Sequence, residues 1–362
     1  MTRMDASVTP LRVGLLGYGL AGSVFHAPLI ATTPGLALDT VVTSDPERQV
    51  RARTAGGRDA DDVRTVATAD ELFARADELD LVVVATPNKT HVSLARQALE
   101  AGLPVVVDKP LAATAAEAEA LADLADERGL LLSAFQNRRW DNDFLTLRSL
   151  LDGGALGEVQ RFESRFERWR PKPKGGWRES GDPAEIGGLL YDLGSHLVDQ
   201  ALTLFGPAAS VYAETDVRRA GAEADDDSFI AVTHAGGVRS HLWMSATAAQ
   251  LGPRFRALGS EAAYVKYGLD PQEASLREGA RPAPGLPWGV EPVFAWGTLG
   301  TVDGTRPVPT LDGAYPAYYD AVAVALREGT PPPVTAREAA AALRVLEAAR
   351  LSATESRVVS LR

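Results

Sequence analysis

The sequence predicts a two-part α/β protein, with a doubly wound parallel sheet in the first part and a large, mostly antiparallel open sheet in the second. Three observations predict this class. Short apolar runs alternate with helical patterns over the first third of the 362 residues. A G-x-G-x-x-G loop follows the first apolar run. Beyond that third, polar and apolar residues alternate at period two. We expect the two domains to be residues 1–135 and 136–362.

Short apolar runs supply the strands of the first domain. They are Arg12–Gly17, Leu36–Thr43, Leu81–Thr86, Pro104–Asp108 and Leu130–Phe135. Several are apolar throughout, which is typical of parallel strands covered by helices on both faces. Helices are expected between them, because Thr68 and Thr114 are each followed three residues later by a glutamate, the capping-box signature. Gly129 is placed to end the second of these helices.

The second domain reads as strands joined by turns. Residues Gly157–Pro171 alternate polar and apolar side chains, as expected of a strand with one solvated face. Further candidate strands are Ser210–Val217, Phe229–His234, Val238–Met244 and Tyr264–Tyr267. Because turns rather than helices separate them, this sheet should be largely antiparallel. Alanine-rich helical patterns return at Ala317–Arg327 and Ala336–Glu355.

Composition excludes several classes of function. The formal net charge is -11, so phosphate backbones and anionic lipid are repelled, and we expect no nucleic-acid or membrane partner. The chain has no cysteine, which excludes disulfides and thiolate chemistry. No apolar run approaches the roughly 20 residues that span a bilayer. We expect a cytoplasmic protein, and no metal site, since the acidic run at 224–228 lacks converging ligands.

The glycine loop "GYGLAG" predicts dinucleotide binding. It closes an apolar strand and opens a helix, which is the context in which its spacing has a physical meaning. Gly17 permits a tight turn, Gly19 lets the backbone approach a pyrophosphate, and Gly22 lets the helix pack on the strand. A merely structural glycine turn is the alternative. The loop residues expected to bind the cofactor are Gly17, Tyr18, Gly19, Leu20, Ala21 and Gly22.

The residues at the end of the second strand should contact the adenosine ribose. Asp45 lies a little over 20 residues past Gly22, where a carboxylate accepts from ribose hydroxyls, and Ser44 could donate there. Asp45 is also well placed to cap the next helix, ahead of Pro46. Arg48 could instead meet a 2′-phosphate. We expect NAD to be preferred, with NADP as the alternative.

Two further strand ends should face the ligand crevice. Thr86, Asn88 and His91 follow the fourth strand, where such loops reach the nicotinamide ribose, although His91 could simply begin its helix. Lys109 follows the fifth strand and should project into the same crevice. Most lysines are solvated loop residues, but Pro110 stiffens this turn.

Asp192 and His196 stand four residues apart in an apolar segment. On one helix they would share a face. A neutral imidazole suits proton removal near pH 7. The alternative is a structural histidine that is buried in the core and hydrogen-bonded there.

Four ordered motifs resemble the glucose-fructose oxidoreductase / inositol dehydrogenase / MocA family, in short Gfo/Idh/MocA. They are "GYGLAG", "ATPNKTHVSLARQALEAG", "DKP" and "GGLLYDLGSHLVDQ". The segments "FQNRRWDNDFLTL" and "VKYGLDPQE" resemble the branch with bacterial scyllo-inositol dehydrogenases. The resemblance implies an N-terminal Rossmann domain, a nicotinamide cofactor and a cyclic polyol or sugar substrate. Asp108 stands where many members have glutamate, which keeps the charge.

The resemblance also implies roles for the candidate residues. His196 would be the general base, Lys109 would stabilise the developing alkoxide, and Asp192 would orient the substrate or His196. Substrate contacts are expected from Trp177 and Arg178, on a basic loop before this segment, and from Tyr191. A surface loop without ligand contact is the alternative for that loop.

Two other functions stay open beside a dehydrogenase. One is a non-catalytic ligand-sensing regulator on the same fold, and the other is an NAD-dependent glycosidase. We also expect a homodimer or homotetramer, because bulky strand residues of the second sheet should leave apolar side chains on its open face. Those residues are Tyr212, Phe229, Ile230, Leu242 and Trp243.

Overall fold

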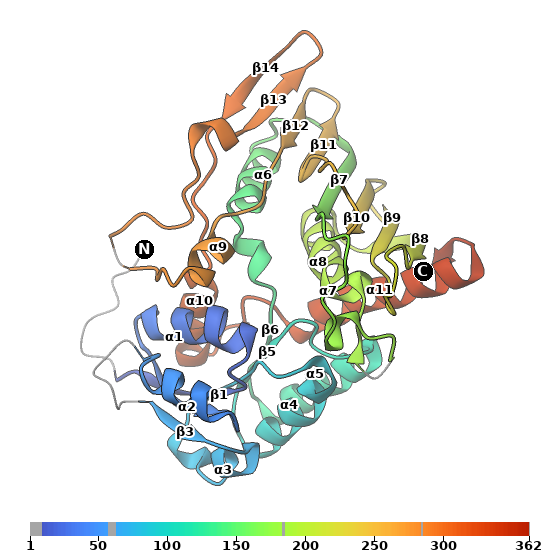
Figure 1. Cartoon of the computed structure of the whole chain (residues 1–362). Helices are drawn as coiled ribbons and strands as arrows, with labels where there is room; N and C mark the ends of the chain where they lie inside the picture. Colours follow the sequence, from blue (N-terminus) through green and yellow to red (C-terminus); the bar gives the residue numbers. More distant parts are fainter. Residues whose placement is uncertain (1–8, 57–62, 183–184, 284, 362) are drawn as a thin grey trace.

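The first sheet is parallel, six-stranded and ordered β3-β2-β1-β4-β5-β6 (Figure 1). A computed structural model describes residues 9–56, 63–182, 185–283 and 285–361. The strands are β1 Leu11–Leu16, β2 Leu36–Val42, β3 Arg64–Val66, β4 Leu81–Val84, β5 Val105–Asp108 and β6 Leu132–Phe135. The central strands β4 and β5 are built of buried valines and leucine, as required where helices cover both faces. The predicted doubly wound domain is confirmed, and β3 is a strand that the sequence patterns missed.

Helices connect these strands and carry the predicted caps. They are the π-helical η1 Ala21–His26, α1 Ala27–Thr32, α2 Pro46–Arg53, α3 Ala69–Phe73, α4 His91–Glu100 and α5 Ala115–Arg128, with short 3₁₀ turns η2 Ala76–Glu78 and η3 Asn88–Thr90. Thr114 and Glu117 form a reciprocal capping box at the start of α5. Gly129 ends that helix in the left-handed conformation, with φ of 64°.

The second sheet has nine strands in the order β14-β13-β12-β11-β7-β10-β9-β8-β15. The strands are β7 Val159–Glu167, β8 Ala208–Asp216, β9 Asp227–His234, β10 Arg239–Ser245, β11 Phe255–Gly259, β12 Ala263–Lys266, β13 Gly297–Thr301, β14 Gly304–Val308 and β15 Val359–Ser360. All neighbours pair antiparallel except β7 and β10, which run parallel. The expectation of a mostly antiparallel sheet is therefore confirmed.

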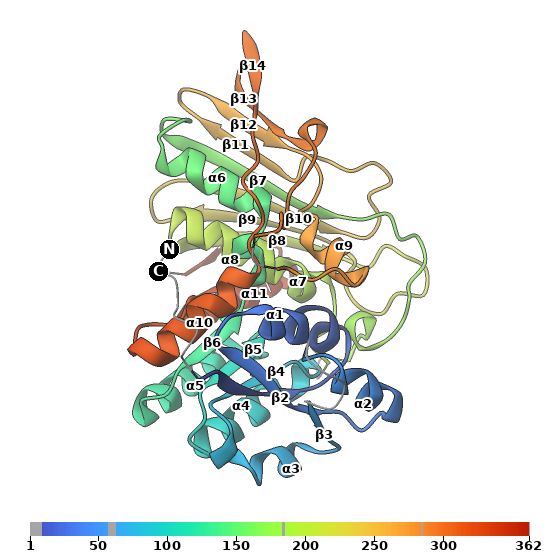
Figure 2. The same ribbon diagram turned by 90° about the vertical axis from the view of Figure 1, so that its left-hand side faces the viewer.

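Helices lie on one face of this second sheet (Figures 1 and 2). In chain order the remaining helices are η4 Asn137–Trp140, α6 Asn142–Asp152, η5 Trp177–Glu179, α7 Leu189–Asp192, α8 Gly194–Phe205, α9 Gln272–Arg277, η7 Val293–Ala295, α10 Pro316–Glu328 and α11 Ala336–Glu355. Ile230 and Leu242 point to this helix-covered face and are fully buried. Tyr212, Phe229 and Trp243 alternate with them on the other face and are only partly buried.

The last two helices return to the first domain. Helix α11 packs along α5 of the first domain and against β8 of the second sheet. It therefore contacts both domains. Backbone pairing joins residues 133–134 of β6 to residues 334–335, just before α11. We propose that the chain divides at residue 135, with α10 and α11 bracing the two domains against each other. Among the described residues, no helix is long and apolar enough to cross a membrane.

Candidate active site

Two adjoining clefts lie at the carboxyl ends of β1, β2, β4 and β5, where ligands bind in open parallel sheets. The first cleft has a volume of about 610 Å³ and follows the glycine loop and the strand ends. The second cleft, about 580 Å³, extends from there to α7, α8 and α9. Residues that line both clefts include Asp108, Lys109, Asp192, Trp177 and Arg178. Ligands in the two clefts would therefore meet these shared side chains.

The glycine loop is shaped for close approach of a ligand. Gly17 has φ of +97°, a backbone conformation that favours glycine. A Cβ on Gly22 would lie 2.1 Å from the carbonyl oxygen of Gly17, so only glycine lets this helix start so close to the strand. A Cβ on Gly19 would meet no protein atom within 4 Å, and Gly19 lines the first cleft. Tyr18, Leu20 and Ala21 line it too, so the loop fits a dinucleotide.

Of the residues that follow β2, those that line the first cleft differ from those expected from the sequence. Ser44 and Arg48 line the first cleft. The Asp45 carboxylate is turned to the start of α2, where it accepts from the backbone N–H of Glu47 at 2.9 Å and of Arg48 at 3.1 Å. It also lies 3.3 Å from Nε of Arg48. The expected contact of Asp45 with a ribose is therefore not supported, because the helix cap holds its carboxylate.

The loop after β4 contributes Thr86 and Asn88 to the first cleft. His91 is fully buried behind it, and the expected contact with a cofactor is wrong. Its Nδ1 lies 2.8 Å from the carbonyl oxygen of Pro110, and its Nε2 lies 2.9 Å from that of Thr86. His91 thus ties the loop after β4 to the loop after β5, and it positions cleft residues without lining the cleft.

Lys109 and Asp192 form an ion pair where the clefts meet. The Lys109 ammonium donates to the Asp192 carboxylate at 2.9 Å and to the Asp192 carbonyl oxygen at 2.5 Å. Both side chains keep some exposure, 15% and 24% respectively. Burial raises the pKa of Asp192, but the Lys109 ammonium and then Arg178 outweigh it and bring the pKa to about 2. Asp192 is therefore ionised at neutral pH.

His196 lies in the wall of the second cleft. The helix expected to carry both Asp192 and His196 breaks at Leu193, so α7 ends at Asp192 and α8 begins at Gly194. The His196 ring is 6% exposed, and its Nδ1 is buried without a hydrogen-bond partner among the described residues. Any proton exchanged with a ligand must therefore pass through Nε2. Burial, and then the charges of Lys109 and nearby arginines, hold the pKa of His196 well below its usual value.

The loop that contains Trp177 and Arg178 closes over both clefts. The Arg178 guanidinium lies 4.2 Å from the centre of the Trp177 ring and 3.8 Å from the Asp192 carboxylate. Tyr191, expected to contact substrate, is wrong in that role, because its side chain is buried on the far side of α7. It lines a separate cavity and lies beneath the Arg350 guanidinium, at 4.6 Å.

Several residues of the second cleft carry no motif that assigns them a role. Arg138, from the segment quoted only for its resemblance, lines it together with Arg168 from the end of β7 and Glu273 from α9. Arg138 donates to Glu273 at 2.6 Å and to Asp141 at 3.3 Å. The signal that could have found it is the pair of arginines before an Asp-x-Asp in a segment that follows the last parallel strand.

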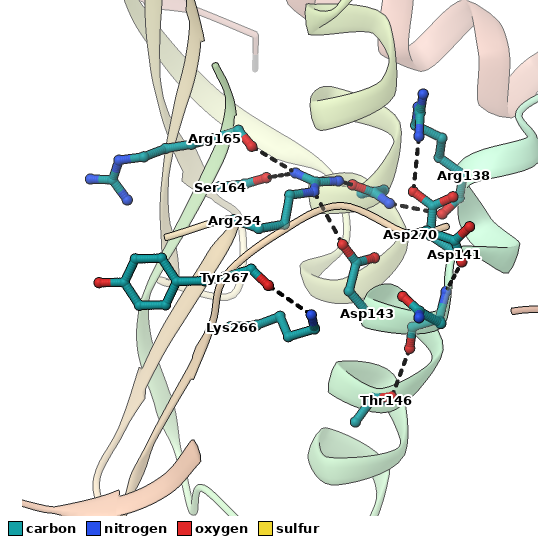
Figure 3. Close-up of polar contacts among 12 residues, drawn as sticks. Arg138, Asp141, Asp143, Thr146, Ser164, Arg165, Arg254, Lys266, Tyr267 and Asp270 are labelled. Carbon is teal, nitrogen blue, oxygen red and sulfur yellow. Dashed lines mark hydrogen bonds and ion pairs between the residues drawn. The ribbon is translucent and has the colours of Figure 1, made fainter. Parts of the chain in front are cut away.

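A buried charge network supports this wall from behind (Figure 3). Arg254, just before β11, lies 3.3 Å from the Asp143 carboxylate on α6 and donates to Ser164 on β7 at 2.7 Å. It also donates to Gln200 at 2.7 Å, and Gln200 in turn donates to the Arg138 carbonyl at 2.8 Å. Since Gln200 is one turn beyond His196 on α8, the network fixes the helix that carries the histidine. The described residues contain no group of three or more His, Cys, Asp or Glu side chains that could hold a metal ion.

Comparison with known proteins agrees with this geometry. Residues 11–136 match the model of an oxidoreductase family with an NAD-binding Rossmann fold, and residues 144–265 match the Gfo/Idh/MocA C-terminal domain. The chain is 37% identical over 358 residues to scyllo-inositol 2-dehydrogenase (NADP(+)) IolW of Bacillus subtilis (strain 168), which covers 98% of this chain and 97% of that protein. It is 44% identical over 341 residues to the uncharacterized oxidoreductase YdgJ of Escherichia coli (strain K12), covering 93% and 94% respectively.

Solved structures extend the likeness to the fold. The Bacillus subtilis protein yvaA superposes with a TM-score of 0.91 at 36% identity, over 99% of this chain and 100% of that one. The match therefore spans both sheets. The chain belongs to the Gfo/Idh/MocA family of NAD(P)-dependent oxidoreductases.

Proposed function

We propose that the protein transfers a hydride between NADP and a secondary alcohol of a cyclic polyol or sugar, with His196 as the acid-base group. One observation carries the proposal: Lys109, Asp192 and His196, from two distant segments, line a single cleft that adjoins the glycine loop. The nicotinamide accepts or donates the hydride when the cofactor is bound. The inositol substrate of IolW supports a polyol or sugar as the other partner.

His196 is suited to hold the alcohol proton. Its pKa, held down by burial and by nearby cations, keeps the ring neutral at pH 7, so Nε2 has a free lone pair. Loss of hydride from an alcohol that keeps its proton would give a high-energy protonated ketone. A base that accepts the hydroxyl proton as the C–H bond breaks avoids that species. In the reverse direction the imidazolium returns that proton to the carbonyl oxygen.

Lys109 and Asp192 complete the site around the reacting oxygen. The Lys109 ammonium has three N–H donors, of which two are directed to Asp192. The third donor is then free to stabilise negative charge on the substrate oxygen. The Asp192 carboxylate fixes the lysine rather than the histidine, so we assign Asp192 the role of positioning Lys109 and accepting from a neighbouring substrate hydroxyl.

The cofactor choice follows from the residues after β2. Arg48 and Ser44 line the first cleft, whereas the Asp45 carboxylate, which would repel a 2′-phosphate, is held at the start of α2. We therefore infer that NADP binds more tightly than NAD, contrary to the expectation from sequence. The predicted result is that Arg48→Ala weakens binding of adenosine 2′,5′-bisphosphate, with little effect on AMP, in a calorimetric titration. Equal loss for both nucleotides would contradict this inference.

A substrate screen separates the three functions left open by the sequence. The full-length protein is mixed with NADP or NAD and a panel of inositols and hexoses, and absorbance at 340 nm is followed. Net formation of reduced cofactor supports a dehydrogenase. Cleavage of a glycoside without net reduction supports a glycosidase, and ligand binding without either reaction supports a regulator. His196→Ala serves as the control for turnover.

A homo-oligomer through the open face of the second sheet is also part of the proposal. Phe229 and Trp243 lie 5.1 Å apart between ring centres, and His241 packs 5.8 Å from Phe229. Partly exposed aromatic clusters of this kind are typical of interfaces between copies of a chain. We expect a dimer or tetramer by light scattering, dissociated by Trp243→Glu. A cytoplasmic location, where the NADP pool is available, is expected as well, and cell fractionation tests it.

A further inference from the structure

The second cleft carries more positive charge than its own acids can neutralise. Its basic residues are Lys109, Arg138, Arg168, Arg170, Lys174, Arg178 and Arg277, against the acids Asp108, Glu179, Asp192 and Glu273. This excess stands out because the whole chain has a net charge of -11. A cationic cleft on an acidic protein attracts anionic ligands selectively.

The four acids of the cleft are already engaged. Asp192 holds Lys109, and Glu273 holds Arg138 at 2.6 Å and Arg277 at 2.8 Å. Glu179 accepts from the backbone N–H groups of residues 174 and 175 and from the Arg219 guanidinium at 3.0 Å. Asp108 accepts from the backbone N–H of Lys109 and lies 3.8 Å from the His26 ring. Asp192 also lies 3.8 Å from the Arg178 guanidinium, and none of the four carboxylates forms an ion pair with Arg168, Arg170 or Lys174.

Arg168 is the cation of greatest interest. It is half-buried, its guanidinium lies 4.8 Å from the centre of the Phe166 ring, and no carboxylate of the described residues lies within ion-pair distance of it. Burial, and then the charge of Arg170, lower the pKa of Arg168 to about 10, and the carboxylates of Asp192 and Glu273 offset this only in part. The group still carries its charge at pH 7, in surroundings that favour its neutral form. An anion beside it would relieve that cost.

The neighbours of Arg168 are cations on the same segment. Arg170 and Lys174 follow it along the chain after β7, and both are exposed at the mouth of the second cleft. Neither Arg168 nor Arg170 lines the first cleft, where the glycine loop and Arg48 face a dinucleotide. The charge of Arg168 also acts on Asp192 and His196, which places it close to the reacting groups.

We infer that the second cleft contains an anion subsite formed by Arg168 and Arg170, so that the substrate is an acidic sugar or polyol bearing a carboxylate or a phosphate ester. The inference rests on the proposed function and names its substrate class. Arginine binds both groups through two parallel N–H donors, and the flanking Lys174 adds a point charge. The reacting hydroxyl then lies toward His196 and Lys109, on the other side of the same ring.

The test uses three ligands that share one ring. D-Glucose, D-glucuronate and D-glucose 6-phosphate differ only at the last carbon, which bears a neutral, a carboxylate or a phosphate group. Their dissociation constants are measured by calorimetry on the full-length protein saturated with NADP. We expect at least one acid to bind about 10- to 100-fold more tightly than glucose, the range for a charge-assisted hydrogen bond. Which acid gains more distinguishes carboxylate from phosphate.

Substitutions at Arg168 and at a control residue test whether the preference for acids depends on Arg168. Arg168→Gln should reduce the ratio of acid to glucose affinity by about tenfold or more, and Arg168→Lys should reduce it less. Lys172→Gln is the matched control, because it removes one charge from the same loop at an exposed residue that lies outside the cleft lining. It should leave the ratio unchanged. Thermal unfolding of each variant checks that the fold persists.

Two results overturn the inference. One is that neither acid binds more tightly than glucose, which includes the case in which none of the three binds. The other is that Lys172→Gln lowers the ratio as much as Arg168→Gln, since the selectivity would then be a general effect of loop charge. Turnover of neutral polyols with NADP would leave the proposed function standing in either case, so the two failures are distinguishable.

Discussion

Replacing His196 gives the sharpest test of the mechanism. His196→Ala removes the group that we assign to the alcohol proton, in a wall where the ring is only 6% exposed and solvent is a poor substitute. Loss of a positioned general base costs about 10²–10⁴-fold in rate. At 1.36 kcal/mol for each factor of ten, this is about 3–5 kcal/mol of barrier. The first cleft does not include His196, so cofactor binding should be unchanged.

The pH dependence separates a base from a structural residue. Because burial and then Lys109 hold the pKa of His196 below its usual value of about 6.5, the ring stays neutral as pH falls from 8 to that value. Oxidation should therefore be flat through neutral pH and decline only where the ring becomes protonated. The alanine variant should lose this decline, and added imidazole should restore part of the rate.

The assay is kcat, followed at 340 nm with saturating NADP and the best polyol of the screen. The dissociation constant of NADP, from quenching of tryptophan fluorescence, is the control. Turnover close to wild type in His196→Ala would refute the assignment. So would an acidic decline that persists in the variant, because another group would then be taking the proton.

Three further predictions test where the structure places Asp45, the loop glycines and Tyr191. Asp45→Ala should lower the free energy of unfolding by about 1 kcal/mol, the usual cost of an N-cap, and leave the preference between NADP and NAD unchanged in kcat/KM. Gly22→Ala should lower the melting temperature strongly, since its Cβ would lie 2.1 Å from the Gly17 carbonyl, whereas Gly19→Ala should weaken only NADP binding. Tyr191→Phe should leave KM for the substrate unchanged, because its ring faces a separate cavity; a raised KM would contradict that placement.

Local patterns predicted most elements of the first domain and five strands of the second sheet, but not the strands β11, β13, β14 and β15. An alanine-rich helical pattern predicted α11 at its observed bounds, Ala336–Glu355, because helix-forming residues stand next to one another in the sequence. Strand-helix alternation predicted the parallel sheet, and a parallel sheet necessarily brings the glycine loop and Lys109 to one edge. The short strand β3 and the parallel pairing of β7 with β10 were missed, because three residues carry little periodicity and register is set by distant partners.

Only the tertiary structure decided where the polar side chains point. Asp45 had two partners consistent with its sequence position, and the start of α2 took its carboxylate. Asp192 found its partner in Lys109, 83 residues away, rather than in His196, because the helix breaks at Leu193. Arg138 and Arg168 of the second domain converge on one cleft with Lys109 of the first domain. Such contacts depend on side-chain rotamers and on the packing of distant segments, and neither is encoded within the few residues that a local pattern reads.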